Sequence, residues 1–133
     1  MAKPAKNRPR RAVRPETPLL FFDDSILADL RDLLAPADFA AIVAKARETL
    51  PATLHDVHQA WKAGDREETG RHAHKLAGLA GNFGGRALME AARQVENACR
   101  KGSTRQLVRL IGGLEGLLQP TLDALNQSTA PPG

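Results

Sequence analysis

The sequence predicts an all-α protein, an antiparallel up-down four-helix bundle with a short extra N-terminal helix. Apolar residues recur every three or four positions along most of the 133-residue chain, whereas no stretch alternates with a period of two. Aromatic residues make up 4% of the chain, which is typical of helical cores built from Leu, Ala, Val and Ile. The connections between the periodic stretches are short, and short connections favour antiparallel neighbours.

Charge and proline divide the chain into a bundle and two tails. Residues 1–18 combine six basic residues with four prolines and almost no apolar side chains, which predicts a disordered basic tail. That tail serves either solubility or a weak electrostatic attraction to acidic surfaces. Residues 19–126 are expected to form the bundle and residues 127–133 a second disordered tail. Because the bundle is nearly neutral, nothing in it indicates a nucleic-acid-binding surface.

The first two predicted helices lie on either side of a proline. Residues 23–25 offer a cap for the first helix, which ends at Pro36. Asp38 is a candidate cap for a long second helix that stops near Gly64. Pro51 falls within this helix, and we expect a kink or a break there because proline lacks an N–H donor and clashes with the preceding turn.

Three further helices complete the predicted bundle. Asp65 caps the third, which runs to about Phe83 and is followed by a turn at residues 84–85. The fourth ends at residues 100–102, where two basic residues and a glycine suit a helix C-terminus. The fifth begins at residue 103 or 104. Four of its residues weaken it and predict a bend: Gly112, Gly113, Gly116 and Pro120.

The third helix places His74 among small residues. A glycine inside a helix costs about 1 kcal/mol relative to alanine, so this segment reflects selection for something other than helix stability. At about 100° per residue, five residues share the face of His74: Gly70, Arg71, Gly78, Gly81 and Gly85. The opposite face carries apolar residues, namely Leu76, Leu79, Ala80 and Phe83. An imidazole with such small neighbours is accessible to the active site of another protein.

Imidazole is a side chain that can act as a nucleophile at neutral pH without a large shift of its pKa. One ring nitrogen attacks while the other keeps its proton. The chemistry therefore needs an acceptor for that proton and a cation near the negative charge that develops. Lys75 follows His74 directly, and Arg71 lies one turn earlier on the same face. Both are candidates to contact a phosphoryl group.

The remaining histidines and the single cysteine predict no further chemistry. His72 falls near the apolar face, and His55 and His58 are too few ligands to indicate a metal site. Cys99 has no intramolecular disulfide partner, so we expect a buried thiol in a reducing compartment. No apolar run approaches the roughly 18 residues that cross a bilayer. The sequence thus predicts a cytoplasmic protein with no membrane contact and no metal site.

A longer motif surrounds His74. Ala73, His74, Leu76 and Gly78 follow the order Ala-His-x-Leu-x-Gly, and Gly84 supplies a further glycine. The next helix then presents a Leu, a small residue and an apolar-Glu pair: Leu88, Ala92 and Val95-Glu96. This pattern resembles the histidine-containing phosphotransfer (HPt) domains of phosphorelays, and the resemblance extends over roughly residues 23–125.

The resemblance implies a role for each matching position. His74 would be phosphorylated, Gly78 would let a receiver domain approach, and Glu96 would accept from the other ring nitrogen. Many members have a lysine where this chain has Ala77. Either Lys75 or Arg71 substitutes for it, or the phosphohistidine is less stabilised. The expected partner-binding residues are Gly70, Gly78, Gly81, Asn82 and Gly85.

By the same resemblance, a monomer would relay a phosphoryl group between receiver-domain aspartates of a two-component phosphorelay. Its partners would be response-regulator receiver domains, a hybrid histidine kinase, or both. The chain needs no cofactor of its own, because Mg²⁺ is expected on the receiver. It has no phosphate-binding glycine loop, so we expect no ATP-dependent kinase activity. The alternative function is an interaction module that binds a receiver or kinase domain and regulates it without accepting phosphate.

Overall fold

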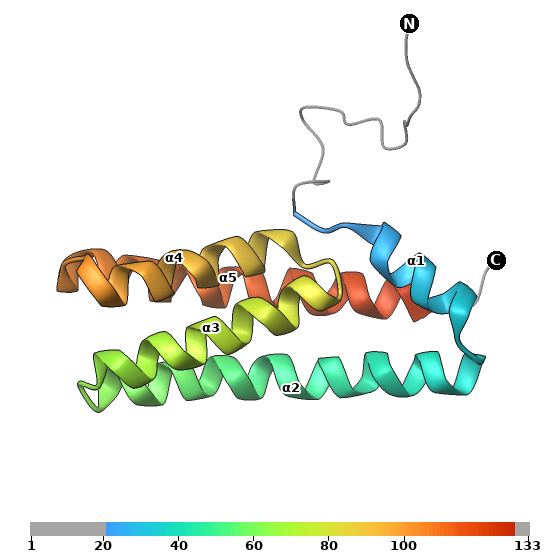
Figure 1. The fold of residues 1–133 in the computed structure, drawn as a ribbon, viewed down its shortest axis with the longest axis horizontal. Helices are drawn as coiled ribbons and strands as arrows, with labels where there is room; N and C mark the ends of the chain where they lie inside the picture. The colour runs from blue at the N-terminus through green and yellow to red at the C-terminus, as the bar shows by residue number, and fades with distance from the viewer. Residues whose placement is uncertain (1–20, 130–133) are drawn as a thin grey trace, which may run out of the picture.

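The computed structural model describes residues 21–129, and every regular element in that range is an α-helix (Figure 1). In chain order the helices are α1 (Asp24–Leu33), α2 (Pro36–Lys62), α3 (Arg66–Asn82), α4 (Arg86–Lys101) and α5 (Thr104–Thr129). Helices α2 to α5 lie side by side, and α2 packs on α3, α3 on α4, α4 on α5 and α5 on α2. The predicted all-α fold is confirmed. The expected tail at residues 1–18 lies outside the described residues.

Unequal helix lengths explain the place of α1. Helices α2 and α5 have 27 and 26 residues and span about 40 Å, whereas α3 and α4 have 17 and 16 and span about 25 Å. The long helices therefore extend beyond the turn between α3 and α4, and α1 packs against both of them there (Figure 1). Leu27 of α1 is buried in this contact region. Thus α1 extends the core along the part of α2 and α5 that reaches beyond this turn.

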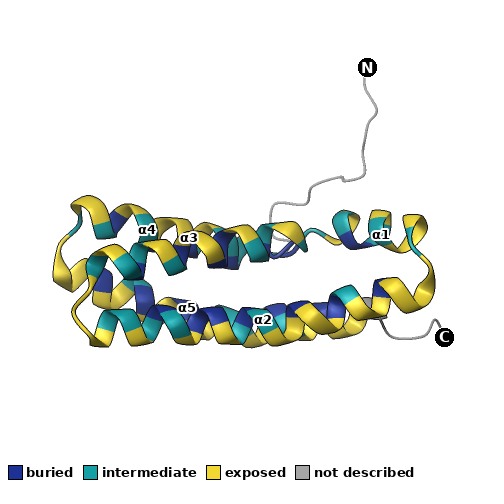
Figure 2. Ribbon diagram, turned by 60° about the horizontal axis from the view of Figure 1, so that its bottom comes forward, coloured by how far each residue is buried: buried dark blue, intermediate teal, exposed yellow. Residues whose placement is uncertain are grey.

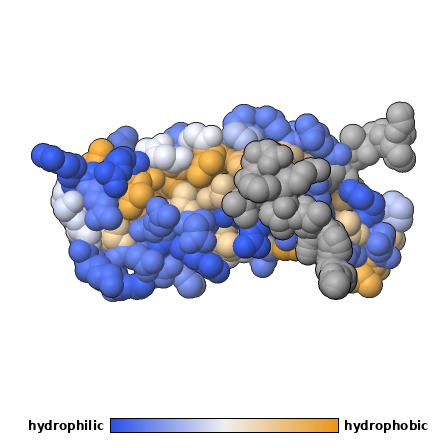
Figure 3. All heavy atoms as spheres, turned by 90° about the horizontal axis from the view of Figure 1, so that it is seen from above, coloured by the Kyte–Doolittle hydropathy of each residue, from blue (hydrophilic) through white to orange (hydrophobic). Residues whose placement is uncertain are grey.

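The core lies between the facing sides of the helices (Figure 2). Its largest fully buried side chains are leucines and valines from all five helices: Leu27, Val43, Leu50, Leu54, Val57, Leu76, Leu88, Val95, Leu107, Leu114 and Leu125. Seen from above, the surface is mainly hydrophilic and is interrupted by a more apolar band (Figure 3). No helix within residues 21–129 combines the length and apolar character that crossing a bilayer requires.

The segment before α1 is fixed to the turn between α3 and α4. The N–H of Asp23 donates to the carbonyl of Gly84 at 2.6 Å, and the N–H of Ala87 donates to the carbonyl of Phe21 at 3.0 Å. Gly84 has φ +90°, and a Cβ built there would clash with the carbonyl oxygen of Asp23. Only glycine combines this conformation with this close approach. The turn also sets the direction in which α4 leaves α3.

Two predicted helix boundaries at the site are confirmed. Asp65 caps α3, and its side chain accepts from the N–H of Glu68 at 3.0 Å. Gly64 precedes it with φ +76°, so the connection from α2 turns sharply. Helix α4 ends at Lys101 with Gly102 as its C-cap. The cap of α3 and the turns at both ends of the pair α3 and α4 fix where these helices begin and end.

Other boundaries differ from the predictions. Helix α2 begins at Pro36 rather than after Asp38, because proline at the first helical position needs no N–H partner and has a suitable φ. Of the kink or break expected at Pro51, the break is wrong, because the helix continues through this residue. Buried Leu50 and Leu54 hold the helix in the core on both sides of that residue. At the other end, α5 is a single helix that includes residues 127–129, which we expected in the C-terminal tail.

Candidate functional site

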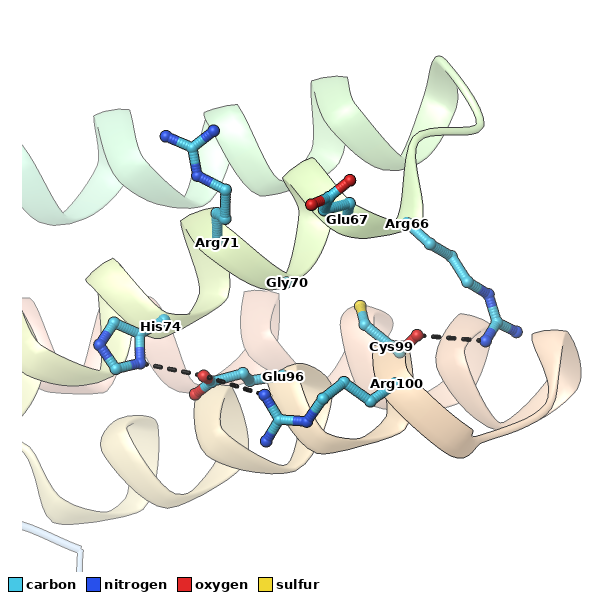
Figure 4. A pocket seen from close by; sticks show the side chains of 8 residues that line it. All are labelled: Arg66, Glu67, Gly70, Arg71, His74, Glu96, Cys99 and Arg100. Atoms are coloured by element: carbon cyan, nitrogen blue, oxygen red, sulfur yellow. Dashed lines mark hydrogen bonds and ion pairs between the residues drawn. The ribbon is translucent and has the colours of Figure 1, made fainter.

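His74 lies at the midpoint of α3 and projects away from the core. Its side chain is 75% exposed, whereas the neighbouring Ala73 and Leu76 are fully buried. Nδ1 of His74 lies 3.0 Å from Oε2 of Glu96 on α4. A carboxylate only accepts, so the proton of this hydrogen bond belongs to Nδ1. Nε2 is then the ring nitrogen that keeps a free lone pair, and it points away from Glu96 along α3 (Figure 4).

Glu96 connects His74 to a basic residue. Its side chain is only 21% exposed, and its Oε2 also lies 3.7 Å from the guanidinium of Arg100. Arg100 in turn donates to the side chain of Asn97 at 2.9 Å. The carboxylate therefore stays near the ring as a negative group with two partners. It fixes both the tautomer and the direction of the imidazole.

Two hollows flank the pair formed by His74 and Glu96. The first, the Nδ1-side hollow, has a volume of about 700 Å³ (Figure 4). Its lining comes from the first half of α3 and the second half of α4: Arg66, Glu67, Gly70, Arg71, His74, Glu96, Cys99 and Arg100. The second, the Nε2-side hollow, has a volume of about 260 Å³. Its lining comes one turn further along α3 and one turn earlier on α4: His74, Ala77, Gly78, Arg93, Glu96 and Asn97.

The arginines of the Nδ1-side hollow already have partners. Arg66 donates to the carbonyl of Cys99 at 3.4 Å, and Arg71 forms an ion pair with Glu68 on its own helix. In Figure 4 the side chain of Arg71 extends away from the ring of His74. The sequence offered Arg71 as a phosphoryl contact, but the structure places it on the side of the protonated nitrogen.

Comparison with known proteins identifies the family. Residues 41–128 match the family model of the Hpt domain. The chain belongs to the Hpt domain family. Among solved structures, it is similar to histidine-containing phosphotransfer protein B (HptB) from Pseudomonas aeruginosa PAO1, with a TM-score of 0.76 and 22% sequence identity. The match covers 82% of this chain and 94% of that chain, and it shows the shared fold. A search of the curated proteins found no match.

Membership of the Hpt family assigns the chain to histidine phosphotransfer in two-component signalling. Hpt domains are phosphotransfer intermediates and not kinases, and they interact with receiver domains or histidine kinases. The geometry at His74 agrees with this assignment. An exposed ring has one nitrogen held by a carboxylate and the other available to a partner.

The glycines that were predicted to share the exposed face of His74 do not all lie there. Gly78 is exposed, and a Cβ built there meets nothing within 4 Å. By contrast, a Cβ at Gly70 would lie 3.3 Å from Cβ of Cys99, and one at Gly81 would lie 2.8 Å from Sδ of Met89. These two glycines allow close packing of α3 against α4.

The prediction for Gly85 as a surface residue is wrong. Gly85 is buried, and a Cβ there would lie 3.1 Å from Cγ2 of Thr121 on α5. Helix α3 ends at Asn82, so Gly85 is the N-cap of α4 and does not continue the face of His74. Asn82, the last residue of α3, is exposed. Lys75 is also exposed but lines neither of the two hollows.

Sequence reasoning missed Arg93. This exposed residue of α4 lines the Nε2-side hollow together with His74. Its position carried a signal, because it precedes Glu96 by three residues and therefore shares the same face of α4. Once Glu96 was assigned as the partner of His74, a cation one turn earlier on that face was a candidate for the site.

The other titratable groups fit structural roles. Nε2 of His72 lies 3.4 Å from Glu68, and that of His58 lies 3.9 Å from Glu115. Within residues 21–129, no group of three or more His, Cys, Asp or Glu side chains is arranged to hold a metal ion. Burial raises the pKa of the Cys99 thiol, and nearby Glu96 adds to this effect while Arg66 and Arg100 oppose it. The thiol is therefore protonated, and unreactive, near neutral pH.

Proposed function

We propose that this Hpt domain relays a phosphoryl group between receiver-domain aspartates through Nε2 of His74. The single observation that carries the proposal is the hydrogen bond between Nδ1 of His74 and Glu96 on a ring that is 75% exposed. It directs the lone pair of Nε2 away from the bundle. The expected partners are response-regulator receiver domains, a hybrid histidine kinase, or both.

The transfer needs no cofactor on this chain. The lone pair of Nε2 attacks the phosphorus of an aspartyl phosphate, so that an N–P bond forms as the P–O bond to the aspartate breaks. The aspartate leaves as a carboxylate with the electron pair of that bond. Mg²⁺ held by the receiver would offset charge on the phosphoryl oxygens. Reversal of the same step on a second receiver completes the relay.

Glu96 supports both directions of the transfer. When Nε2 forms a bond to phosphorus, positive charge develops on the ring, and the carboxylate 3.0 Å from Nδ1 stabilises it. The proton stays on Nδ1 throughout, so no general base is required. All of these groups belong to one chain, which is consistent with a monomeric relay protein.

Gly78 supports close approach of the receiver. It lies one turn beyond His74, is exposed, and lines the Nε2-side hollow. Without a side chain at this position, the receiver surface can come near the α3 backbone while its aspartyl phosphate reaches Nε2.

Incubation with a phosphorylated receiver domain tests the proposal. The wild-type protein should acquire an acid-labile, base-stable label, and His74→Gln should acquire none. His72→Gln is the matched control and should be labelled normally. Label on His74→Gln would overturn the proposal. Receiver binding without any label on the wild type would instead indicate an interaction module that does not accept phosphate.

A further inference from the structure

We propose that the guanidinium of Arg93 binds the phosphoryl group carried on Nε2 of His74. This inference rests on the proposed phosphorylation of His74. Arg93 lines the Nε2-side hollow together with His74, and it lies on α4 one helical turn before Glu96. The sequence had offered Lys75 and Arg71 for this role.

The distribution of basic residues favours Arg93. Arg66, Arg71 and Arg100 line the Nδ1-side hollow, where the ring nitrogen is protonated and bonded. Each of these three has a partner: the carbonyl of Cys99, the carboxylate of Glu68 and the carboxylate of Glu96, respectively. A phosphoryl group on Nε2 would lie beyond the other edge of the ring (Figure 4).

Arg93 is available for a new contact. It is exposed, and within residues 21–129 no protein group forms a hydrogen bond or an ion pair with it. A guanidinium presents paired N–H donors in a plane that matches two phosphoryl oxygens. Because Arg93 has no competing ion pair to break, binding the phosphoryl group costs only the ordering of its side chain and the removal of water from the two charged groups.

The shape of the hollow also fits the proposal. Ala77, on α3, is 4% exposed and offers only a methyl group to this hollow, which Arg93 lines from α4. The volume of about 260 Å³ is several times the roughly 30 Å³ that a water molecule occupies in the liquid. There is room for both the phosphoryl oxygens and the guanidinium. Gly78 leaves the outer side of the hollow open.

The proposed contact offsets an unfavourable charge in the hollow. Glu96 lines the same hollow, and its negative charge repels a phosphoryl group on His74. The hydrogen bond to Nδ1 and the ion pair with Arg100 reduce this repulsion on one side. Arg93 reduces it on the other side, one helical turn away on α4. Arg93 would thus stabilise the phosphoryl charge both during transfer and on the phosphohistidine.

Two readouts test this role. The first is the rate of labelling by a phosphorylated receiver domain, which Arg93→Ala should lower about tenfold, as expected for one lost charge-assisted hydrogen bond at an exposed site. The second uses phosphoramidate as donor, so that no receiver is needed, and follows the ³¹P shift of phosphohistidine against pH. A nearby cation favours the dianion, so Arg93→Ala should raise the phosphoryl pKa by about 0.5–1 unit.

Matched variants separate this contact from general charge effects. Arg105→Ala removes the same charge from an exposed position in the first turn of α5 that lines neither hollow, and both readouts should stay at wild-type values. Arg93→Lys should retain most of the effect on the phosphoryl pKa. Adding Ala77→Lys to Arg93→Ala supplies an ammonium group from the other wall of the hollow, and it should restore both the rate and the pKa.

The outcomes distinguish this inference from the proposed function. If His74 is labelled but Arg93→Ala matches the wild type in both readouts, the inference is wrong and the relay proposal stands. A shift of the phosphoryl pKa in Arg71→Ala instead would place the phosphoryl group in the Nδ1-side hollow and would also refute it. If His74→Gln still accepts label, both proposals fail. Circular dichroism of Arg93→Ala should match the wild type, because the side chain is exposed.

Discussion

Replacing Gly78 with alanine should make the protein more stable and a poorer phosphotransfer partner. Gly78 lies inside α3, and an added Cβ meets nothing within 4 Å. Alanine is favoured over glycine inside a helix by about 0.8–1 kcal/mol. For a domain of this size, 1 kcal/mol raises Tm by roughly 4 °C. The folded protein therefore gains stability from the very change that adds a methyl group beside His74.

The same methyl group should slow transfer from a receiver. A methyl group that intrudes into a close-packed contact costs about 1–3 kcal/mol, so we expect a loss of at least about fivefold in the transfer rate. Gly112→Ala is the matched control. Gly112 is exposed within α5 and also has open space around an added Cβ, so this variant should gain similar stability with unchanged transfer.

Thermal unfolding by circular dichroism and the initial rate of label transfer measure the two effects on the same samples. Gly78→Ala with higher Tm and wild-type transfer would refute close approach of the receiver at this residue. A lower Tm would refute the conclusion that the space around Gly78 is open.

Three further predictions concern the turn, the histidine partner and the thiol. Gly84→Ala should lower the free energy of unfolding by about 2–3 kcal/mol in urea titrations, because it combines a positive φ with a clash against Asp23; a neutral result would contradict the turn geometry. Glu96→Ala should lose about tenfold in rate, whereas Glu96→Gln loses the negative charge but keeps an acceptor for Nδ1 of His74 and should lose less; equal losses would show that the hydrogen bond adds nothing to the effect of the charge. Burial raises the pKa of Cys99. Its alkylation by iodoacetamide should therefore begin to accelerate at a higher pH than the alkylation of glutathione, and fast reaction at pH 7 would contradict this.

The sequence was sufficient to predict most of the fold because local signals and apolar spacing agree. Asp65 lies before a helix with a run of buried positions, and it caps that helix as expected. Predictions failed where packing outweighs local preference. Pro51 lacks an N–H donor, yet α2 continues through it because buried residues on both sides keep the helix in the core.

The candidate site was predictable to the extent that it depends on one helix. Spacing along α3 predicts that His74 and Gly78 are exposed on one face, and both are. Which glycines of that face are covered depends on the path of α4, which periodicity does not encode. Gly85, which is buried, was therefore misplaced on the exposed face. Arg93 was overlooked although it precedes Glu96 by three residues and so shares its face of α4.

The relay through Nε2 depends on which nitrogen of His74 carries the phosphoryl group, and this can be measured. Long-range ¹H–¹⁵N and ³¹P spectra of the labelled protein, after transfer from a phosphorylated receiver, distinguish the two ring positions. Phosphorus should be found on Nε2, with Nδ1 still protonated and hydrogen-bonded to Glu96. Phosphorus on Nδ1 of His74, or on any other residue, would contradict it.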